Sequence, residues 1–475
     1  MRTETTQWSD QPASEQSHNG RLQLAVALAM ILSLLVAFTV WAGLPPEGER
    51  LPFIGGIVIL ALMTAGFAAL GWHLFIRPLP EGQIVPREQG MSAFTRQILA
   101  VLIVIAGINF VIGAFWDEVW HRQYGVPFGE DFFWRPHLMM YFCFLLITVF
   151  AFASLYHITQ RGRGTFQQRF RANPLVGLLV LGCGFILYAV AADPIWHLIY
   201  GEDISAWSIP HIMLVLSFVV MMLLSLSLHL STLPPRQWRG LLPATSSDIL
   251  PVVALGFVPM LALQLLTAEW EQPQVLPIVE ARPDWLLGAN ITAIGCFVGA
   301  LVNHSMRRWG MAAAAVGLAF ALRFILTSTL PHPEVTIRAF VLLAAVMLTF
   351  DALYTLSGLR TGKPPHWLLA GAGTGLIAAV IVLPTINALY VYPTIDAGNL
   401  LPMVLSMVVA GVGGVWTGRV LGDEIAARVY DRSLKAEDVA VRRADGRRVG
   451  VITLMALVPM ALFIAFFIAT AEPPI

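Results

Sequence analysis

Long apolar segments alternate with short polar ones along almost the whole chain. Each apolar run is close to the roughly 20 residues that a helix needs to cross a bilayer. Continuous apolar runs predict helices, because membrane strands would show short segments of alternating hydrophobicity. We therefore expect an all-α, polytopic membrane bundle of about 13 transmembrane helices, at 21–44, 51–76, 97–116, 133–156, 174–192, 207–229, 248–268, 285–303, 309–330, 336–358, 366–390, 399–421 and 449–470.

The composition supports this class. Hydrophobic residues make up 57% of the chain and charged residues 12%, and the mean hydropathy is +0.73. Such values exclude a soluble domain of 475 residues. The formal net charge is zero, which gives no indication of nucleic-acid binding. The expected partner is the lipid bilayer, with other membrane subunits as a further option.

The polar segments divide the chain into four parts. Residues 1–20 are rich in Ser, Gln and Thr and are expected to form a disordered cytoplasmic tail. A membrane domain of about 12 spans follows over 21–421. Residues 422–448 carry mixed charges and are expected to form a cytoplasmic connector, solvated or folded as a short interfacial helix. The last span is expected at 449–470.

Basic residues are concentrated in alternate loops. One set of connections holds 23 of the 29 Lys and Arg residues. The opposite set holds only Arg50, Arg122, Arg135 and Arg282. Because Lys and Arg accumulate on the cytoplasmic side, we expect a multi-pass protein of the plasma membrane with a cytoplasmic N-terminus and an external C-terminus.

Two loops on the expected external side share one ordered motif. Residues 117–137 are DEVWHRQYGVPFGEDFFWRPH, and residues 193–211 are DPIWHLIYGEDISAWSIPH. Both contain Asp-x-x-Trp-His, then Tyr-Gly, Glu-Asp, Trp and Pro-His. An apolar segment precedes and follows each copy, so the pattern predicts a duplicated helix-loop-helix unit over 97–156 and 174–229.

The spacing within each copy is typical of a metal site. An Asp and a His four residues apart lie on one face of a helix, and the Pro-His pair is expected to begin the returning helix. A carboxylate and two imidazoles are ligands of non-haem iron, zinc and some copper sites. The residues placed in this way are Asp117, His121 and His137 in the first copy and Asp193, His197 and His211 in the second.

The first copy also contains Glu118, which is a candidate fourth ligand or a hydrogen-bond acceptor for a ligating imidazole. A structural explanation stays open for both copies. Asp and His side chains can tie two helix ends together by hydrogen bonds, and Trp and Tyr gather at membrane interfaces without any metal.

The second copy resembles a known ligand set. Asp193, His197 and His211 are similar in spacing to the copper-binding Asp, His and His of the membrane C subunit of particulate methane and ammonia monooxygenases. The resemblance covers roughly twenty residues, and this chain differs in its duplicated motif and wider loops. It implies that copper is favoured, with iron or zinc as alternatives, and that dioxygen oxidises a small substrate.

Three classes of function therefore remain. The first is a membrane metalloenzyme with its metal at the external face. The second is a transporter or metal-handling protein, for which Arg323 and Asp351, both inside expected spans, are candidates for a buried polar pathway. These two residues could equally form a mutually satisfied pair or face the interface. The third is a structural membrane subunit that packs around a partner.

Small residues and cysteines have simpler interpretations. Gly371 with Gly375, and Gly414 with Gly418, are spaced as in helices that approach each other closely. The three cysteines each fall inside an expected span and are expected to pack in the core, because their spacing fits neither a disulfide framework nor a zinc knuckle. They are Cys143, Cys183 and Cys296.

Overall fold

The structure is a computed structural model of the chain. It describes residues 69–77, 91–124, 133–161, 164–200, 209–238, 248–271, 282–330, 337–431 and 443–471, together with a few isolated positions. Side chains at the ends of some of these ranges, including that of His197, are outside the description. The tail at 1–20 and most of the first two expected spans, 21–44 and 51–76, also lie outside the described residues.

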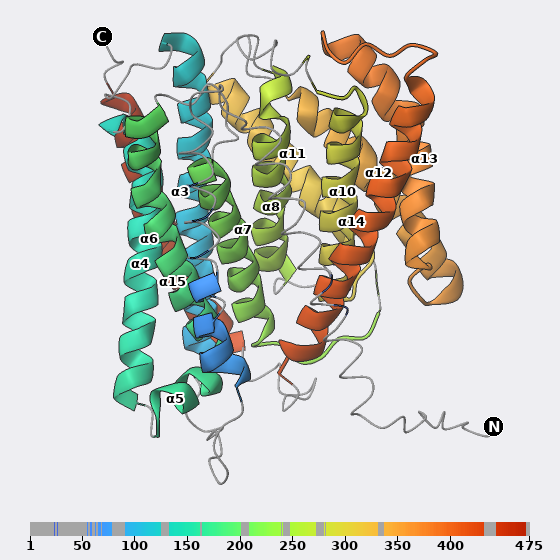
Figure 1. The fold of residues 1–475 in the computed structure, drawn as a ribbon. Coiled ribbons are helices and arrows are strands. Elements are labelled where there is room, and N and C mark those ends of the chain that lie inside the picture. Colours follow the sequence, from blue (N-terminus) through green and yellow to red (C-terminus); the bar gives the residue numbers. More distant parts are fainter. Residues whose placement is uncertain are drawn as a thin grey trace, which may run out of the picture.

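The described chain is built from helices, most of which run along a common axis (Figure 1). The helices are η2 (Trp72–Ile76), α3 (Ala93–Tyr124), α4 (Arg135–Arg161), α5 (Phe166–Ala172), α6 (Pro174–Tyr200), α7 (Ile209–Leu230), α8 (Ile249–Thr267), η6 (Ala268–Glu271), α10 (Trp285–Met306), α11 (Met311–Thr329), α12 (Arg338–Thr361), α13 (Trp367–Leu389), α14 (Leu400–Arg428) and α15 (Arg443–Ala469).

Eleven of the described helices are long and apolar enough to cross a membrane. They correspond to the third to thirteenth spans expected from the sequence. The prediction of an all-α, polytopic helical bundle is therefore confirmed. A bilayer requires this outcome, since each helix satisfies its own backbone hydrogen bonds within the apolar layer.

Helix ends extend beyond the apolar runs that predicted them. α3 continues through Tyr124 and α6 through Tyr200, so both Asp-x-x-Trp-His stretches are helical. At the other end of the bundle, α14 continues to Arg428 and α15 begins at Arg443, which makes both ends of the expected connector 422–448 helical. Hydropathy marks where a helix leaves lipid, whereas the helix itself ends where its backbone hydrogen bonds end.

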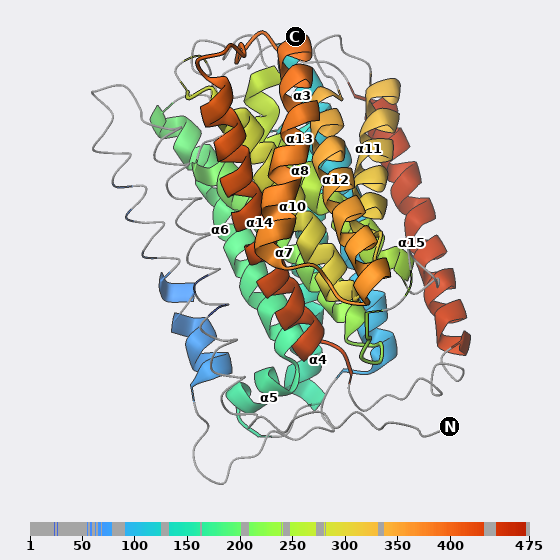
Figure 2. The same ribbon diagram turned by 90° about the vertical axis from the view of Figure 1, so that its right-hand side faces the viewer.

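The helices form two neighbouring groups (Figures 1 and 2). In the first, α3 packs against α4 and α7, while α6 packs against α7 and α4. In the second, α10 packs extensively along α14, and α13 lies between α14 and α12. α8 contacts members of both groups, and α15 returns to pack against α3. The end of α3 that carries the polar motif thus faces α4 and α7.

Glycines allow the second group to pack closely. A Cβ atom on Gly414 of α14 would lie 2.7 Å from the Ala293 carbonyl oxygen of α10, and one on Gly375 of α13 would lie 2.6 Å from the Met407 carbonyl oxygen of α14. Backbone atoms cannot move aside as a flexible side chain can. The prediction that these glycines permit close helix contacts is confirmed. Cys143, Cys183 and Cys296 are free and buried, as expected for packing residues.

Candidate metal site

The last turns of α3 and the first turn of α4 place three polar side chains together. Asp117 and His121 are one helical turn apart on the same face of α3. His137 is the third residue of α4 and follows Pro136, which the first turn of a helix tolerates because its missing N–H has no intrahelical acceptor. The Leu138 N–H donates to the Trp134 carbonyl at 2.8 Å and closes this turn.

The three side chains converge on one point. The Nε2 atoms of His137 and His121 lie 2.9 and 3.5 Å from Asp117 Oδ1. One ligand atom from each residue lies within 4.8 Å of those of the other two. Ligand atoms bound to one transition-metal ion at about 2.0–2.2 Å are themselves roughly 3–4 Å apart. Small side-chain shifts would therefore let all three reach one ion.

Tryptophan rings enclose this cluster. The His121 ring lies 4.9 Å from that of Trp134, which in turn lies 5.7 Å from Trp120. Trp116 extends the aromatic wall at 5.0 Å from Trp120. All three tryptophans are buried, whereas the Asp and His side chains of the cluster keep 12 to 25% of their surface exposed. Tryptophan rings thus cover one side of the cluster, and its Asp and His side chains remain partly accessible to solvent.

His121 retains a nitrogen that could hold a ligand. Its Nδ1 atom is buried and has no hydrogen-bond partner among the described residues. A buried polar atom without a partner is costly, so it usually binds water, an ion or another group. The chemistry of the set, one carboxylate and two imidazoles, fits a divalent transition metal with coordination positions to spare.

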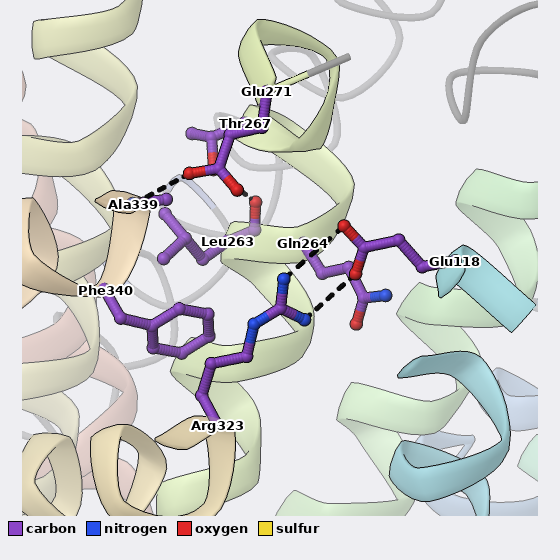
Figure 3. Close-up of a pocket in the computed structure, with 8 residues that line it drawn as sticks. All are labelled: Glu118, Leu263, Gln264, Thr267, Glu271, Arg323, Ala339 and Phe340. Atoms are coloured by element: carbon purple, nitrogen blue, oxygen red, sulfur yellow. Dashed lines mark hydrogen bonds and ion pairs between the residues drawn. The ribbon is translucent and has the colours of Figure 1, made fainter. Parts of the chain in front are cut away.

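Glu118 faces away from this cluster. Successive helical residues are about 100° apart around the axis, and Glu118 points toward α11. Its Oε2 accepts from Arg323 Nη1 at 2.9 Å, and its Oε1 accepts from Arg122 Nη2 at 3.0 Å. Figure 3 shows the Arg323 guanidinium directed at this carboxylate. The structure assigns Glu118 to a buried ion-pair network and not to the ligand group.

The second copy is only partly described. Asp193 is buried on α6, and His211 Nε2, on the first turn of α7, lies 3.5 Å from Asp193 Oδ1. The backbone of His197 is helical, but its side chain lies outside the described residues. The Asp–His contact between the two helices therefore repeats that of Asp117 and His137 in the first copy.

The two copies are close to each other in space. α3 packs directly against α7, and the His211 imidazole on α7 interacts electrostatically with the Asp117 carboxylate on α3. The motif spacing did not predict this proximity, because it constrains the residues within each hairpin and not the way in which two hairpins dock.

Arg323 and Asp351 do not pair with each other. Arg323 binds Glu118 and lies over the Phe115 ring at 4.6 Å. Asp351 Oδ1 instead accepts from Asn303 Nδ2 at 2.9 Å, and Asp351 Oδ2 accepts from the Ala313 N–H at 3.2 Å. The expectation of a mutually satisfied pair is therefore wrong. Each residue instead contacts other helices, α3 in the case of Arg323 and α10 and α11 in the case of Asp351.

Glu271 is a further buried acid, and it lies outside both copies of the motif. It lines a cavity of about 10 Å³ together with Glu118 and Arg323 (Figure 3). Its Oε1 accepts from the Ala339 N–H at 3.0 Å and from the Tyr390 hydroxyl at 3.1 Å. Burial raises the pKa of Glu271 above its usual value. No local spacing connects these residues, which come from separate helices and loops.

Comparisons of the chain with protein-family models, with curated proteins and with solved structures gave no match.

Proposed function

We propose that this integral membrane protein binds a transition-metal ion, with copper favoured and iron or zinc as alternatives, through Asp117, His121 and His137. The observation that carries the proposal is the convergence of these ligand atoms within 4.8 Å from two helices. The i, i+4 pair and the Pro-His turn produce this geometry locally, so it does not depend on distant packing.

A bound metal ion explains the grouping of Asp117, His121 and His137 better than a hydrogen bond that only joins two helix ends. One Asp–His hydrogen bond is enough to join two helix ends, yet a second imidazole approaches the same oxygen, Asp117 Oδ1. This convergence of two imidazole nitrogens on one carboxylate oxygen is expected where a cation lies between the three groups.

The finer proposal is an oxygenase-like metalloenzyme. A copper or iron ion with an open coordination position can activate dioxygen or a small substrate. The protein would hold that ion with one carboxylate and two imidazoles and would limit access of water through Trp120 and Trp134. The likeness of the second copy, Asp193, His197 and His211, to the monooxygenase trio supports this chemistry.

We extend the proposal to the second copy as another metal site. The contact between His211 and Asp193 supports it. The packing of α3 with α7 and of α6 with α4 is the arrangement expected of two equivalent hairpins related by an approximate twofold axis. On the expected topology, both sites would lie at the external face of the plasma membrane.

Metal content tests the proposal. Copper, iron and zinc per chain would be measured by mass spectrometry after purification without chelators and after exposure to each ion. We expect His121→Ala and His137→Ala to lower the occupancy of the first site strongly and to leave that of the second site unchanged, because three protein ligands leave little redundancy within one site. His157→Ala is the matched control, since His157 lies on α4 with His137 but near the opposite end of that helix.

The outcomes separate the classes of function. A wild-type protein without metal under every condition, or His121→Ala with full occupancy, would leave the structural subunit as the explanation. Bound metal with dioxygen consumption on addition of a reductant supports the oxygenase. Bound metal that the protein releases across a vesicle membrane, without such consumption, indicates a transporter or metal-handling protein.

A further inference from the structure

A second polar region lies at the end of the bundle opposite the Asp–His cluster. The C-terminal ends of α10 and α14 and the N-terminus of α13 border a cavity of about 480 Å³. Two arginines, two histidines, one aspartate and two prolines line it. Its volume falls within the roughly 300–1,000 Å³ that is usual for small-molecule sites.

Basic groups outnumber acidic ones around this cavity. Among the described residues of the lining, Asp423 is the only carboxylate, against Arg307 and Arg419. Asp423 Oδ1 lies 2.7 Å from Arg307 Nη1, and Asp423 Oδ2 lies 3.5 Å from Arg419 Nε. One negative charge cannot neutralise two guanidinium groups. The lining therefore keeps a net positive charge even with both histidines neutral.

Buried contacts hold this arrangement in place. His304 Nδ1 lies 2.9 Å from Asp423 Oδ1, and its Nε2 lies 3.1 Å from the Tyr354 hydroxyl. The His304 side chain is only 2% exposed. The Arg307 guanidinium lies 5.6 Å from the centre of the Trp238 ring. His304 thus holds Asp423 in place, and the Trp238 ring flanks the Arg307 guanidinium.

The N-terminus of α13 adds a second source of positive potential. α13 begins at Trp367, and its N-cap residue, His366, forms no side-chain cap hydrogen bond. The first N–H groups of a helix have no intrahelical acceptor and attract anions, as the helix dipole does. His366 itself lines the cavity. The arginines and the start of this 23-residue helix thus border the same space.

We propose that this cavity binds a phosphate group, carried either by an anionic lipid headgroup or by a soluble phosphate compound. Guanidinium groups match the oxygens of a phosphate, and an uncapped helix N-terminus offers it backbone donors. The cavity lies where α10 and α14 approach their C-terminal ends and α13 begins, and lipid headgroups are expected near the ends of spanning helices. It is also large enough for more than an inorganic ion. This site is independent of the Asp117 cluster and of its metal.

The test measures two probes on the full-length protein. Inorganic phosphate binding would be measured by calorimetry in detergent. Retention of phosphatidylglycerol against phosphatidylcholine would be measured by native mass spectrometry after extraction from nanodiscs that contain both. Arg419→Gln removes one guanidinium and should weaken the binding of whichever probe the wild type holds about tenfold or more, since a charge-assisted hydrogen bond contributes roughly 1.5–3 kcal/mol.

Three further variants make the test specific. Arg360→Gln removes an exposed arginine at the same end of the bundle that does not line the cavity, and it should leave binding unchanged. Arg419→Lys should retain part of the affinity. Asp423→Asn removes the competing carboxylate and should strengthen binding, which a purely structural role of the aspartate does not predict. Thermal unfolding of each variant checks that it is folded.

Selective retention of phosphatidylglycerol, lost in Arg419→Gln, identifies a lipid headgroup as the source of the phosphate. Saturable binding of inorganic phosphate without lipid selectivity identifies a soluble phosphate compound. The proposal is overturned if the wild type shows neither, or if Arg419→Gln and Arg360→Gln change binding equally.

Discussion

Glu118 of α3 and Arg323 of α11 form a buried ion pair, with 2.9 Å between Oε2 and Nη1 and side-chain exposures of 7% and 4%. Glu118 directly follows Asp117, so the pair lies on the face of α3 that turns away from the proposed ligands. It links α3 to α11 on a side of α3 other than the one that carries Asp117 and His121.

Removing the Glu118 charge should destabilise the protein strongly. Glu118→Gln keeps the shape of the side chain but leaves Arg323 buried without its carboxylate, and breaking a buried pair in this way costs about 3–5 kcal/mol. The midpoint of thermal unfolding in detergent would measure the effect. Glu424→Gln is the control, because the Arg428–Glu424 pair has a 55% exposed arginine and exposed pairs contribute about 0–1 kcal/mol.

The same variant distinguishes a ligand from a positioning residue. Folded Glu118→Gln should keep its metal, whereas Asp117→Asn should lose it. If well-folded Glu118→Gln protein lost its metal although Asp117, His121 and His137 were unchanged, Glu118 would be a metal ligand.

Glu271 should make stability depend on pH. Burial raises the pKa of Glu271, and this outweighs the opposing effects of Arg323 and of the Ala339 and Tyr390 hydrogen bonds. A carboxyl group with a raised pKa binds its proton more tightly in the folded state than in the unfolded state. The stability of the fold therefore falls as the pH rises from the ordinary glutamate pKa of about 4.5 through the pKa in the folded state.

Glu271→Gln should remove that dependence, because the amide oxygen can still accept from Ala339 and Tyr390 but carries no charge. The variant should be more stable than the wild type at pH 8, and this difference in thermal stability should be smaller at pH 4.5. Unfolding midpoints across that range would measure it. Parallel curves for the two proteins would show that Glu271 does not titrate within the range.

Adjacent glycines on α14 should respond differently to the same substitution. A Cβ on Gly414 would lie 2.7 Å from the Ala293 carbonyl oxygen, whereas nothing lies within 4 Å of one on Gly413. Gly414→Ala should cost roughly 1–3 kcal/mol by overpacking. Gly413→Ala should be neutral or stabilising by about 0.5–1 kcal/mol, since alanine favours helix. Equal unfolding midpoints would contradict the close α10–α14 contact.

The expected orientation predicts opposite labelling of two exposed positions. Gln123 lies at the end of α3 and Gln160 near the far end of α4, and both are exposed. An impermeant thiol reagent applied to intact cells should label Gln123→Cys but not Gln160→Cys. The native cysteines described are buried, so background labelling should be low. Labelling of Gln160→Cys alone would invert the topology and place the Asp–His cluster in the cytoplasm.

Local patterns in the sequence were sufficient for the eleven described spans and for the proximity of Asp117, His121 and His137. A continuous apolar run in lipid becomes a helix because a helix satisfies its own backbone hydrogen bonds, whereas membrane strands would alternate in hydrophobicity. Asp117 and His121 share a helix face because they are four residues apart, and His137 returns beside them because a short hairpin joins α3 to α4. Each of these relationships acts over one turn or one hairpin, a range that periodicity and spacing encode.

Packing between distant segments decided the partners of Glu118 and the position of the basic cavity. The sequence left Glu118 open as a ligand, and only the tertiary structure showed that Arg323 of α11 binds its carboxylate. The cavity bordered by Arg307, His366 and Arg419 combines the ends of three helices whose residues form no motif in the chain. Which of many apolar helix faces meet is set by shape, by glycine contacts and by the need to pair buried charges. These are properties of the assembled bundle and not of any one segment.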